Sequence, residues 1–216
     1  MNTRALIVMI AGVAAVLFAA STWYAGRSTS VGELAPEETA ALVTDYAPIL
    51  GPREAPVTIV EFFDPACEAC RAFHPIVKDL LVEHKNSVRV VIRYAPFHGE
   101  ASSEAIRVLE AARLQEVFVP VLEALLKEQP RWASHDTPQP GLILRIAGTA
   151  GLDVELAQSQ MMSPDIVAIV NLERSDVEKI GINQTPTFYV NGKPVDPFGE
   201  SELRSLVAAE VTATGS

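Results

Sequence analysis

The stretch VTIVEFFDPACEAC, residues 57–70, decides the fold because it joins an apolar strand to the start of a helix. Residues 57–63 are mainly β-branched or aromatic, which is typical of a buried strand. Apolar side chains then recur at helical spacing over residues 66–84, and Pro75 predicts a kink in that helix. Cys67 and Cys70 therefore lie at the helix N-terminus, where unpaired backbone N–H groups favour a thiolate.

These two cysteines are the only ones in the chain of 216 residues. A disulfide across two intervening residues closes too small a loop to constrain the unfolded chain much, which disfavours a structural role. A Cys-x-x-Cys pair at a strand-to-helix junction is instead typical of a dithiol that cycles with a disulfide. We expect Cys67 to attack disulfides as the nucleophile, and Cys70, one turn later, to resolve the mixed disulfide.

The remaining pattern predicts an α/β domain over residues 51–212. A second apolar strand is expected at residues 88–94, and a hairpin around Asn191-Gly192 and a final helix at residues 199–211 complete the pattern. Between these parts, at about residues 100–180, helical periodicity predicts an insertion. Its last helix is expected to begin after Ser163 as N-cap and to end at Gly181.

The N-terminal segment, residues 1–27, is expected to export the domain. Residues 5–25 form an uncharged, mainly apolar stretch that is long enough for a membrane-spanning helix. We favour an uncleaved anchor that holds the domain on the periplasmic side of a bacterial inner membrane. A cleaved signal peptide and a soluble periplasmic domain are the alternative. Residues 28–50 predict a tether too short for a folded dimerisation module, so a monomer is expected.

The formal net charge of −10 disfavours nucleic acid as a partner. Acidity of this degree is consistent with solubility and says little about the fold. Cysteine usage is more informative, because an exported chain with a single close pair has no disulfide framework. The pair is therefore expected to serve chemistry.

The order of these features resembles the thioredoxin superfamily, and more closely its exported DsbA-like branch. The resemblance covers about residues 51–211. It is carried by residues 57–64, Cys67-Glu68-Ala69-Cys70, Pro75, and Thr185-Pro186 followed by residues 187–192. It implies an α/β thioredoxin fold, in which helices flank a central mixed β-sheet and the helical insertion separates the βαβ half from the ββα half.

The resemblance also implies an activity, namely thiol–disulfide exchange with exported protein substrates, with a membrane redox partner for recycling. No bound cofactor is implied, because the redox-active disulfide Cys67–Cys70 carries the electrons. Related proteins have an acidic residue below the disulfide, at the position of Glu61. They also have a cis proline that faces the cysteines, which implies a cis bond at Pro186 and a place for Thr185 in the substrate groove.

Two acidic side chains near the pair are expected to influence it. Glu61 is a misfit on an apolar strand, so its pKa should be raised and it could exchange a proton with Cys70. A carboxylate paired with a nearby basic residue is the alternative. Glu68 is expected to disfavour the Cys67 thiolate and to give a milder redox couple, unless it points into solvent. Strongly oxidising members of the resembled branch carry a histidine where Ala69 stands.

Two other functions are open from the sequence. Cys67, Cys70 and His74 could offer three ligands to copper or zinc in a metal-binding or metal-delivery protein, although a partly exposed helix histidine is the simpler interpretation. The third hypothesis is a tethered periplasmic chaperone in which the cysteine pair is incidental. His98, which follows the second strand, could lie near the active surface, although an ordinary loop residue is the simpler interpretation.

Overall fold

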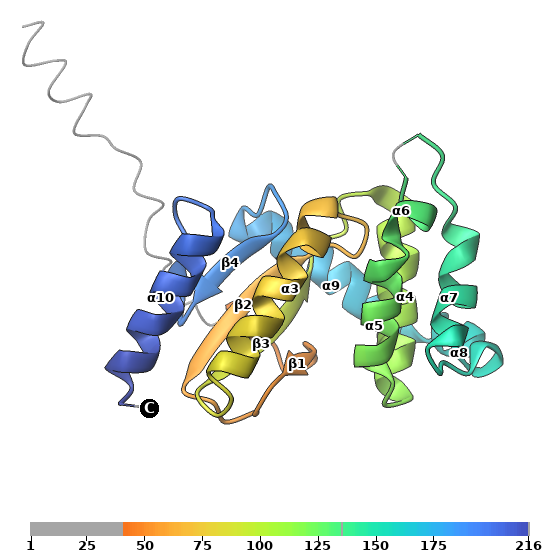
Figure 1. Cartoon of the computed structure of the whole chain (residues 1–216). Coiled ribbons are helices and arrows are strands. Elements are labelled where there is room, and N and C mark those ends of the chain that lie inside the picture. Colours follow the sequence, from red (N-terminus) through yellow and green to blue (C-terminus); the bar gives the residue numbers. More distant parts are fainter. Residues whose placement is uncertain (1–40, 135, 216) are drawn as a thin grey trace, which may run out of the picture. The chain divides into compact units, whose positions relative to one another are not determined.

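The computed structural model describes residues 41–134 and 136–215 (Figure 1). The expected anchor or signal segment, residues 1–27, and most of the expected tether, residues 28–50, lie outside the described residues. In the two described ranges, no helix has both the length and the apolar character needed to cross a membrane.

Within these ranges five strands form one mixed sheet in the order β1-β3-β2-β4-β5. The strands are β1 (Ile49–Leu50), β2 (Val57–Phe63), β3 (Val88–Tyr94), β4 (Thr187–Val190) and β5 (Lys193–Pro194). Strand β2 pairs in parallel with β3 and antiparallel with β4, so the strand that leads to the cysteines lies at the centre of the sheet. Strands β2 and β3 begin and end at the residues that their apolar runs predict.

The helices follow the predicted order, with a helical insertion between β3 and β4. Helix α3 (Glu68–Glu83) connects β2 to β3 and continues through Pro75. The insertion consists of α4 (Gly99–Leu114), α5 (Phe118–Lys127), α6 (Gln129–Trp132), the 3-10 turn η1 (Pro140–Leu142), α7 (Ile143–Thr149), α8 (Val154–Gln160) and α9 (Pro164–Ile180). Helix α10 (Glu200–Ala213) follows β5. In Figure 1, α3 and α10 lie on the near face of the sheet, α9 lies behind it, and the other insertion helices are gathered beside it.

The two faces of β2 contribute to different hydrophobic cores. Ile59 and Phe63 belong to the large core that includes α3 and the insertion, whereas Val60 and Phe62 pack with Val177 of α9. Because successive side chains of a strand point to opposite faces, Glu61 shares the face of Ile59 and Phe63. The acidic misfit of the strand is therefore directed toward the layer that carries the cysteines.

A buried arginine joins the far face of the sheet to α9 and to the start of the described chain. Arg93 of β3 is fully buried, and its Nε donates to both carboxylate oxygens of Glu173, at 3.0 and 3.1 Å. Its Nη2 donates to Asp176 at 2.7 Å, and its Nη1 donates to the carbonyls of Ala41 and Leu42. This network satisfies a charge that would otherwise be costly to bury.

Local sequence signals explain several element boundaries. The Ser163 hydroxyl accepts from the backbone N–H of Ile166 at 3.4 Å, and α9 ends at Gly181, whose φ of 78° is left-handed. Asn191 and Gly192 have φ values of 49° and 82°, as the tight turn between β4 and β5 requires. The N-cap, the helix terminator and the hairpin turn are therefore confirmed at the predicted residues.

Candidate active site

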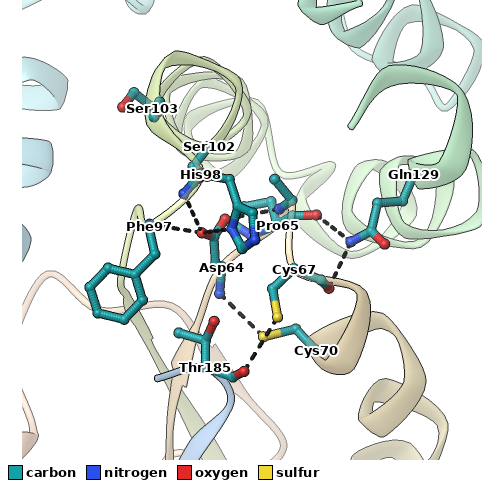
Figure 2. Close-up of polar contacts among 12 residues, drawn as sticks. Asp64, Pro65, Cys67, Cys70, Phe97, His98, Ser102, Ser103, Gln129 and Thr185 are labelled. Carbon is teal, nitrogen blue, oxygen red and sulfur yellow. Dashed lines mark hydrogen bonds and ion pairs between the residues drawn. The ribbon is translucent and has the colours of Figure 1, made fainter. Parts of the chain in front are cut away.

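The cysteine pair lies where β2 ends and α3 begins, at the centre of Figure 2. Cys67 is the N-cap of α3 in an extended conformation, and its backbone N–H donates to the carbonyl of Asp64 at 3.0 Å. Both cysteines are buried, but Cys67 keeps 8% of its surface exposed whereas Cys70 keeps none. Both cysteines are free thiols in the structure. The two sulfur atoms therefore occupy different environments, although they are one helical turn apart.

These environments separate the acidities of the two thiols. Hydrogen bonding from the Cys70 thiol is the largest influence that lowers the pKa of Cys67, which falls from 9.0 to about 5 although burial opposes it. The Thr185 side chain and the backbone N–H groups of Cys70 and Ala69 add to the effect. Burial raises the pKa of Cys70, and its contact with Cys67 and the charge of Glu61 raise it further. Near neutral pH the pair therefore holds one thiolate, on Cys67, and one thiol, on Cys70.

Glu61 lies on β2 and is only 3% exposed. Burial raises the pKa of its carboxyl group from 4.5 to about 8, with a smaller contribution from the charge of Cys67. Its Oε1 has no hydrogen-bond partner among the described residues, so the basic partner considered as an alternative is not found there. A largely protonated carboxyl that interacts electrostatically with both cysteines is suited to proton exchange, and that role remains a prediction.

Thr185 and Pro186 approach the pair from the segment that precedes β4. The peptide bond between them is cis, as the resemblance implied. The Sγ of Cys67 lies 3.3 Å from the carbonyl oxygen of Thr185, to which the protonated thiol donates. The main chain of Thr185 therefore lies beside the sulfur of Cys67, and its role in binding substrate remains a prediction.

Asp64 organises the loop between β2 and α3, a role that the sequence analysis did not assign. Its side chain is fully buried, and Oδ1 accepts from the backbone N–H of Ala66 at 2.9 Å. Its Oδ2 accepts from the backbone N–H groups of Phe97 and His98, at 2.8 and 3.2 Å. The Asp64 main chain contacts both cysteines, because its N–H lies 3.4 Å from the Sγ of Cys70 and its carbonyl accepts from Cys67.

His98 is part of this arrangement, which corrects its interpretation as an ordinary loop residue. Its Nδ1 lies 2.7 Å from the Oδ2 of Asp64, and Figure 2 shows the ring next to that carboxylate. The side chain of His98 is 34% exposed to solvent. The contact joins residues 34 positions apart in the chain, and no local pattern around His98 indicates it.

Gln129 is a second residue that the sequence analysis missed. It belongs to α6 in the insertion and is 1% exposed. Its Nε2 donates to the carbonyls of Pro65 and Cys67, at 2.8 and 2.9 Å (Figure 2). Its Oε1 accepts from Nε of Arg71 at 2.9 Å. The insertion therefore fixes the main chain on both sides of the nucleophile through one buried amide.

Two other expectations change in the structure. Glu68 is exposed and is not among the main influences on the pKa of Cys67, because water weakens its effect. His74 points to the insertion instead of the cysteines, with its Nε2 3.1 Å from Oε1 of Glu123. Among residues 41–134 and 136–215, no three histidine, cysteine, aspartate or glutamate side chains are grouped as a metal site would need.

Comparisons with known proteins agree with this geometry. The family described as thioredoxin matches residues 43–209. The chain is 31% identical over 173 residues to Na(+)/H(+) antiporter NhaA 3 of Salinispora tropica, a match that covers 78% of the chain and 25% of the antiporter. It is 29% identical over 177 residues to Disulfide bond formation protein D of Bacillus subtilis, covering 76% of the chain and 77% of that protein.

The crystal structure of a thioredoxin-like oxidoreductase from Silicibacter pomeroyi superposes with a TM-score of 0.68 at 33% identity. That match covers 81% of this chain and 97% of the other. By contrast, the chain spans only about a quarter of the length of the antiporters that it matches.

Proposed function

The chain belongs to the thioredoxin family, and on that premise we propose that it is a thiol–disulfide oxidoreductase in which Cys67 and Cys70 exchange disulfides with protein substrates. The observation that carries the proposal is the difference between the two thiols. Cys67 is 8% exposed and has a pKa of about 5, whereas Cys70 is fully buried and has a raised pKa. A thiolate that keeps some contact with solvent, beside a fully buried thiol, is the arrangement that disulfide exchange requires.

The exchange transfers two electrons. In the oxidising direction, a substrate thiolate attacks Sγ of Cys67, which breaks the Cys67–Cys70 bond and leaves Cys70 as a thiolate that takes up a proton. A second substrate thiolate then attacks the substrate sulfur of the mixed disulfide. This forms the substrate disulfide and releases Cys67 as a thiolate. The low pKa of Cys67 makes it a good leaving group in this last step, and the pair itself holds the electrons without a bound cofactor.

Glu61 supplies the proton for Cys70 in this scheme. With a pKa of about 8, its carboxyl is largely protonated near neutral pH and can donate when Cys70 leaves as a thiolate. In the reverse direction its carboxylate accepts the proton again. The Glu61 side chain is the titratable carboxyl whose charge acts on Cys70 in the structure.

Thr185 and Pro186 bind the substrate in this proposal. The carbonyl of Thr185 lies 3.3 Å from Sγ of Cys67, so a substrate cysteine bonded to Cys67 places its own main chain beside residue 185. An extended substrate segment would then pair with the main chain there, as in other β-augmentation modes.

The favoured direction is substrate oxidation. A stabilised Cys67 thiolate stabilises the reduced protein, which makes the oxidised form a better acceptor of electrons. The pKa of about 5 is well below that of an ordinary thiol, and Glu68 does not offset it. The name of the Bacillus subtilis relative, a disulfide bond formation protein, supports the same direction.

The proposed location is the periplasmic side of a bacterial inner membrane. The support is the uncharged apolar stretch at residues 5–25, which would anchor the chain, or would export it and be cleaved. Residues 41–50 pack in the domain and include β1, so of the expected tether only residues 28–40 would link the domain to the membrane. The domain would act there as a monomer, close to a membrane redox partner that reoxidises the pair.

The test uses the full chain in detergent, with Cys67→Ser as the matched control. We expect the protein with its disulfide formed to oxidise a reduced, unfolded substrate protein, and the control to be inactive. Equal activity of the two proteins would overturn the proposal. Stoichiometric copper or zinc in the reduced protein, without exchange activity, would favour the metal-binding alternative.

A further inference from the structure

A buried carboxylate beside the redox pair creates an electrostatic problem. Asp64 is fully buried, its carboxylate accepts from three backbone N–H groups, and its main chain contacts both cysteines. Such a carboxylate is an acceptor in its ionised form. An uncompensated negative charge this close to Cys67 would raise the pKa of the thiol and lower the amount of thiolate.

His98 is the basic side chain that faces this carboxylate. Its Nδ1 lies 2.7 Å from Oδ2 of Asp64, and in the described residues it is the basic side chain that forms an ion pair with Asp64. Its main-chain N–H also donates to Oδ2 and to the hydroxyl of Ser102, at 3.2 and 3.1 Å. His98 is therefore held by two contacts, one with Ser102 in the first turn of α4 and one with Asp64 in the loop that carries the cysteines.

We infer that His98 is a positioning residue for the redox pair: its imidazolium neutralises Asp64 and so favours the thiolate of Cys67. The inference rests on the proposed exchange activity. The strongly oxidising members of the resembled branch have a histidine between their two cysteines. This chain has Glu68 and Ala69 there. Here the corresponding positive charge comes from the turn before α4, held in place by Asp64.

The effect depends on pH in a defined direction. The hydrogen bond with Asp64 is the largest cause that raises the pKa of His98, and the charges of Asp64, Cys67 and Glu68 raise it further. Asp64 and Cys67 belong to the segment between β2 and α3, Glu68 is the first residue of α3, and Ser102, which contacts His98 from α4, is neutral. His98 is therefore a cation below its raised pKa and loses the charge as the pH rises through it. Its support of the Cys67 thiolate is lost over the same range.

The test compares His98→Gln and His98→Lys with the unmodified full chain. Glutamine can keep the hydrogen bond to Asp64 without a positive charge, and lysine restores a charge. The matched control is His74→Gln, because His74 also pairs with a carboxylate, that of Glu123, but points away from the cysteines. Two readouts are measured over a pH series: the pKa of Cys67 from the ultraviolet absorbance of the thiolate, and the equilibrium with glutathione.

We expect His98→Gln to raise the pKa of Cys67 by about 1 unit. It should also shift the glutathione equilibrium about tenfold toward the disulfide form, which corresponds to a reduction potential about 30 mV lower. The difference from the unmodified chain should vanish above the pKa of His98. His98→Lys should restore the unmodified values and keep them at higher pH, and His74→Gln should change neither readout.

Two outcomes would overturn the inference. One is an unchanged Cys67 titration and glutathione equilibrium in His98→Gln, and the other is an equal shift in His98→Lys, which would indicate a purely structural role. Failure of the unmodified chain to exchange disulfides with glutathione would instead contradict the proposed function. The two failures are therefore distinguishable.

Discussion

Replacing Glu61 with glutamine should make the stability of the protein less dependent on pH. The residue is 3% exposed, and its carboxyl has a pKa raised from 4.5 to about 8. A buried acid with a raised pKa must lose its proton in an environment that opposes the charge. It therefore destabilises the folded state progressively as the pH rises from 4.5 toward 8.

The magnitude follows from that rise in pKa. At about 1.4 kcal/mol per unit, the rise from 4.5 to about 8 corresponds to a loss of about 5 kcal/mol in the free energy of unfolding once the pH exceeds both values. Between about pH 5 and about pH 9, the loss attributable to this group is about 4 kcal/mol. Glutamine keeps the volume of the side chain but does not ionise. Its unpaired amide costs about 1–3 kcal/mol, and this cost is independent of pH.

The assay is denaturant unfolding of the reduced full chain at about pH 5, 7 and 9. We expect the stability of the unmodified protein, relative to Glu61→Gln, to fall by about 4 kcal/mol over this range. Glu68→Gln is the matched control, because it removes an exposed carboxylate from the adjacent segment. Its free energy of unfolding should change with pH in the same way as that of the unmodified protein. In the oxidised protein, which lacks the Cys67 thiolate, the difference should be smaller. Parallel stability curves for Glu61→Gln and the unmodified protein would refute the reasoning.

Further predictions concern the cysteines, the insertion and the far face of the sheet. Cys67→Ser should abolish exchange, whereas Cys70→Ser should accumulate mixed disulfides on non-reducing gels; the reverse pattern would exchange the two roles. Gln129→Leu should lower the free energy of unfolding by about 2–4 kcal/mol and slow exchange, because it removes the donor to the carbonyl of Pro65 and one of the two donors to the carbonyl of Cys67. Normal exchange kinetics in folded Gln129→Leu would show that the insertion does not position the nucleophile. Arg93→Met should lower the free energy of unfolding, measured with denaturant, by about 3–5 kcal/mol, because the buried Glu173 carboxylate loses its ion-pair partner. The reduction potential should stay unchanged.

The parts of the fold that the sequence predicted correctly depend on local signals. The β-branched run of β2, the Ser163 cap, the Gly181 terminator and the Asn191-Gly192 turn each specify the conformation of a few adjacent residues. The same holds for the cysteines, because the helix start is determined by the change of periodicity after β2. These features did not need knowledge of the packing.

The rest of the site depends on contacts between distant segments. Gln129 reaches the main chain of Cys67 from 62 residues away, and His98 reaches Asp64 from 34 residues away. Polar residues of these types are common in loops and short helices, so their sequence positions did not distinguish them. The weak effect of Glu68 depends on its exposure to water, which the dipeptide sequence does not specify. In the structure the pKa of Cys67 is lowered mainly by Cys70 and Thr185 instead.

The most direct test of the account is the pH dependence of alkylation of the reduced full chain, with the modified cysteine identified by mass spectrometry. The account predicts that Cys67 alone reacts rapidly, and that its rate follows a single titration with a midpoint of about 5. Cys70 should stay unmodified while the protein is folded, because it is buried and has a raised pKa. A midpoint near the roughly 8.5 of an ordinary thiol, or preferential modification of Cys70, would contradict the assignment of Cys67 as the activated nucleophile.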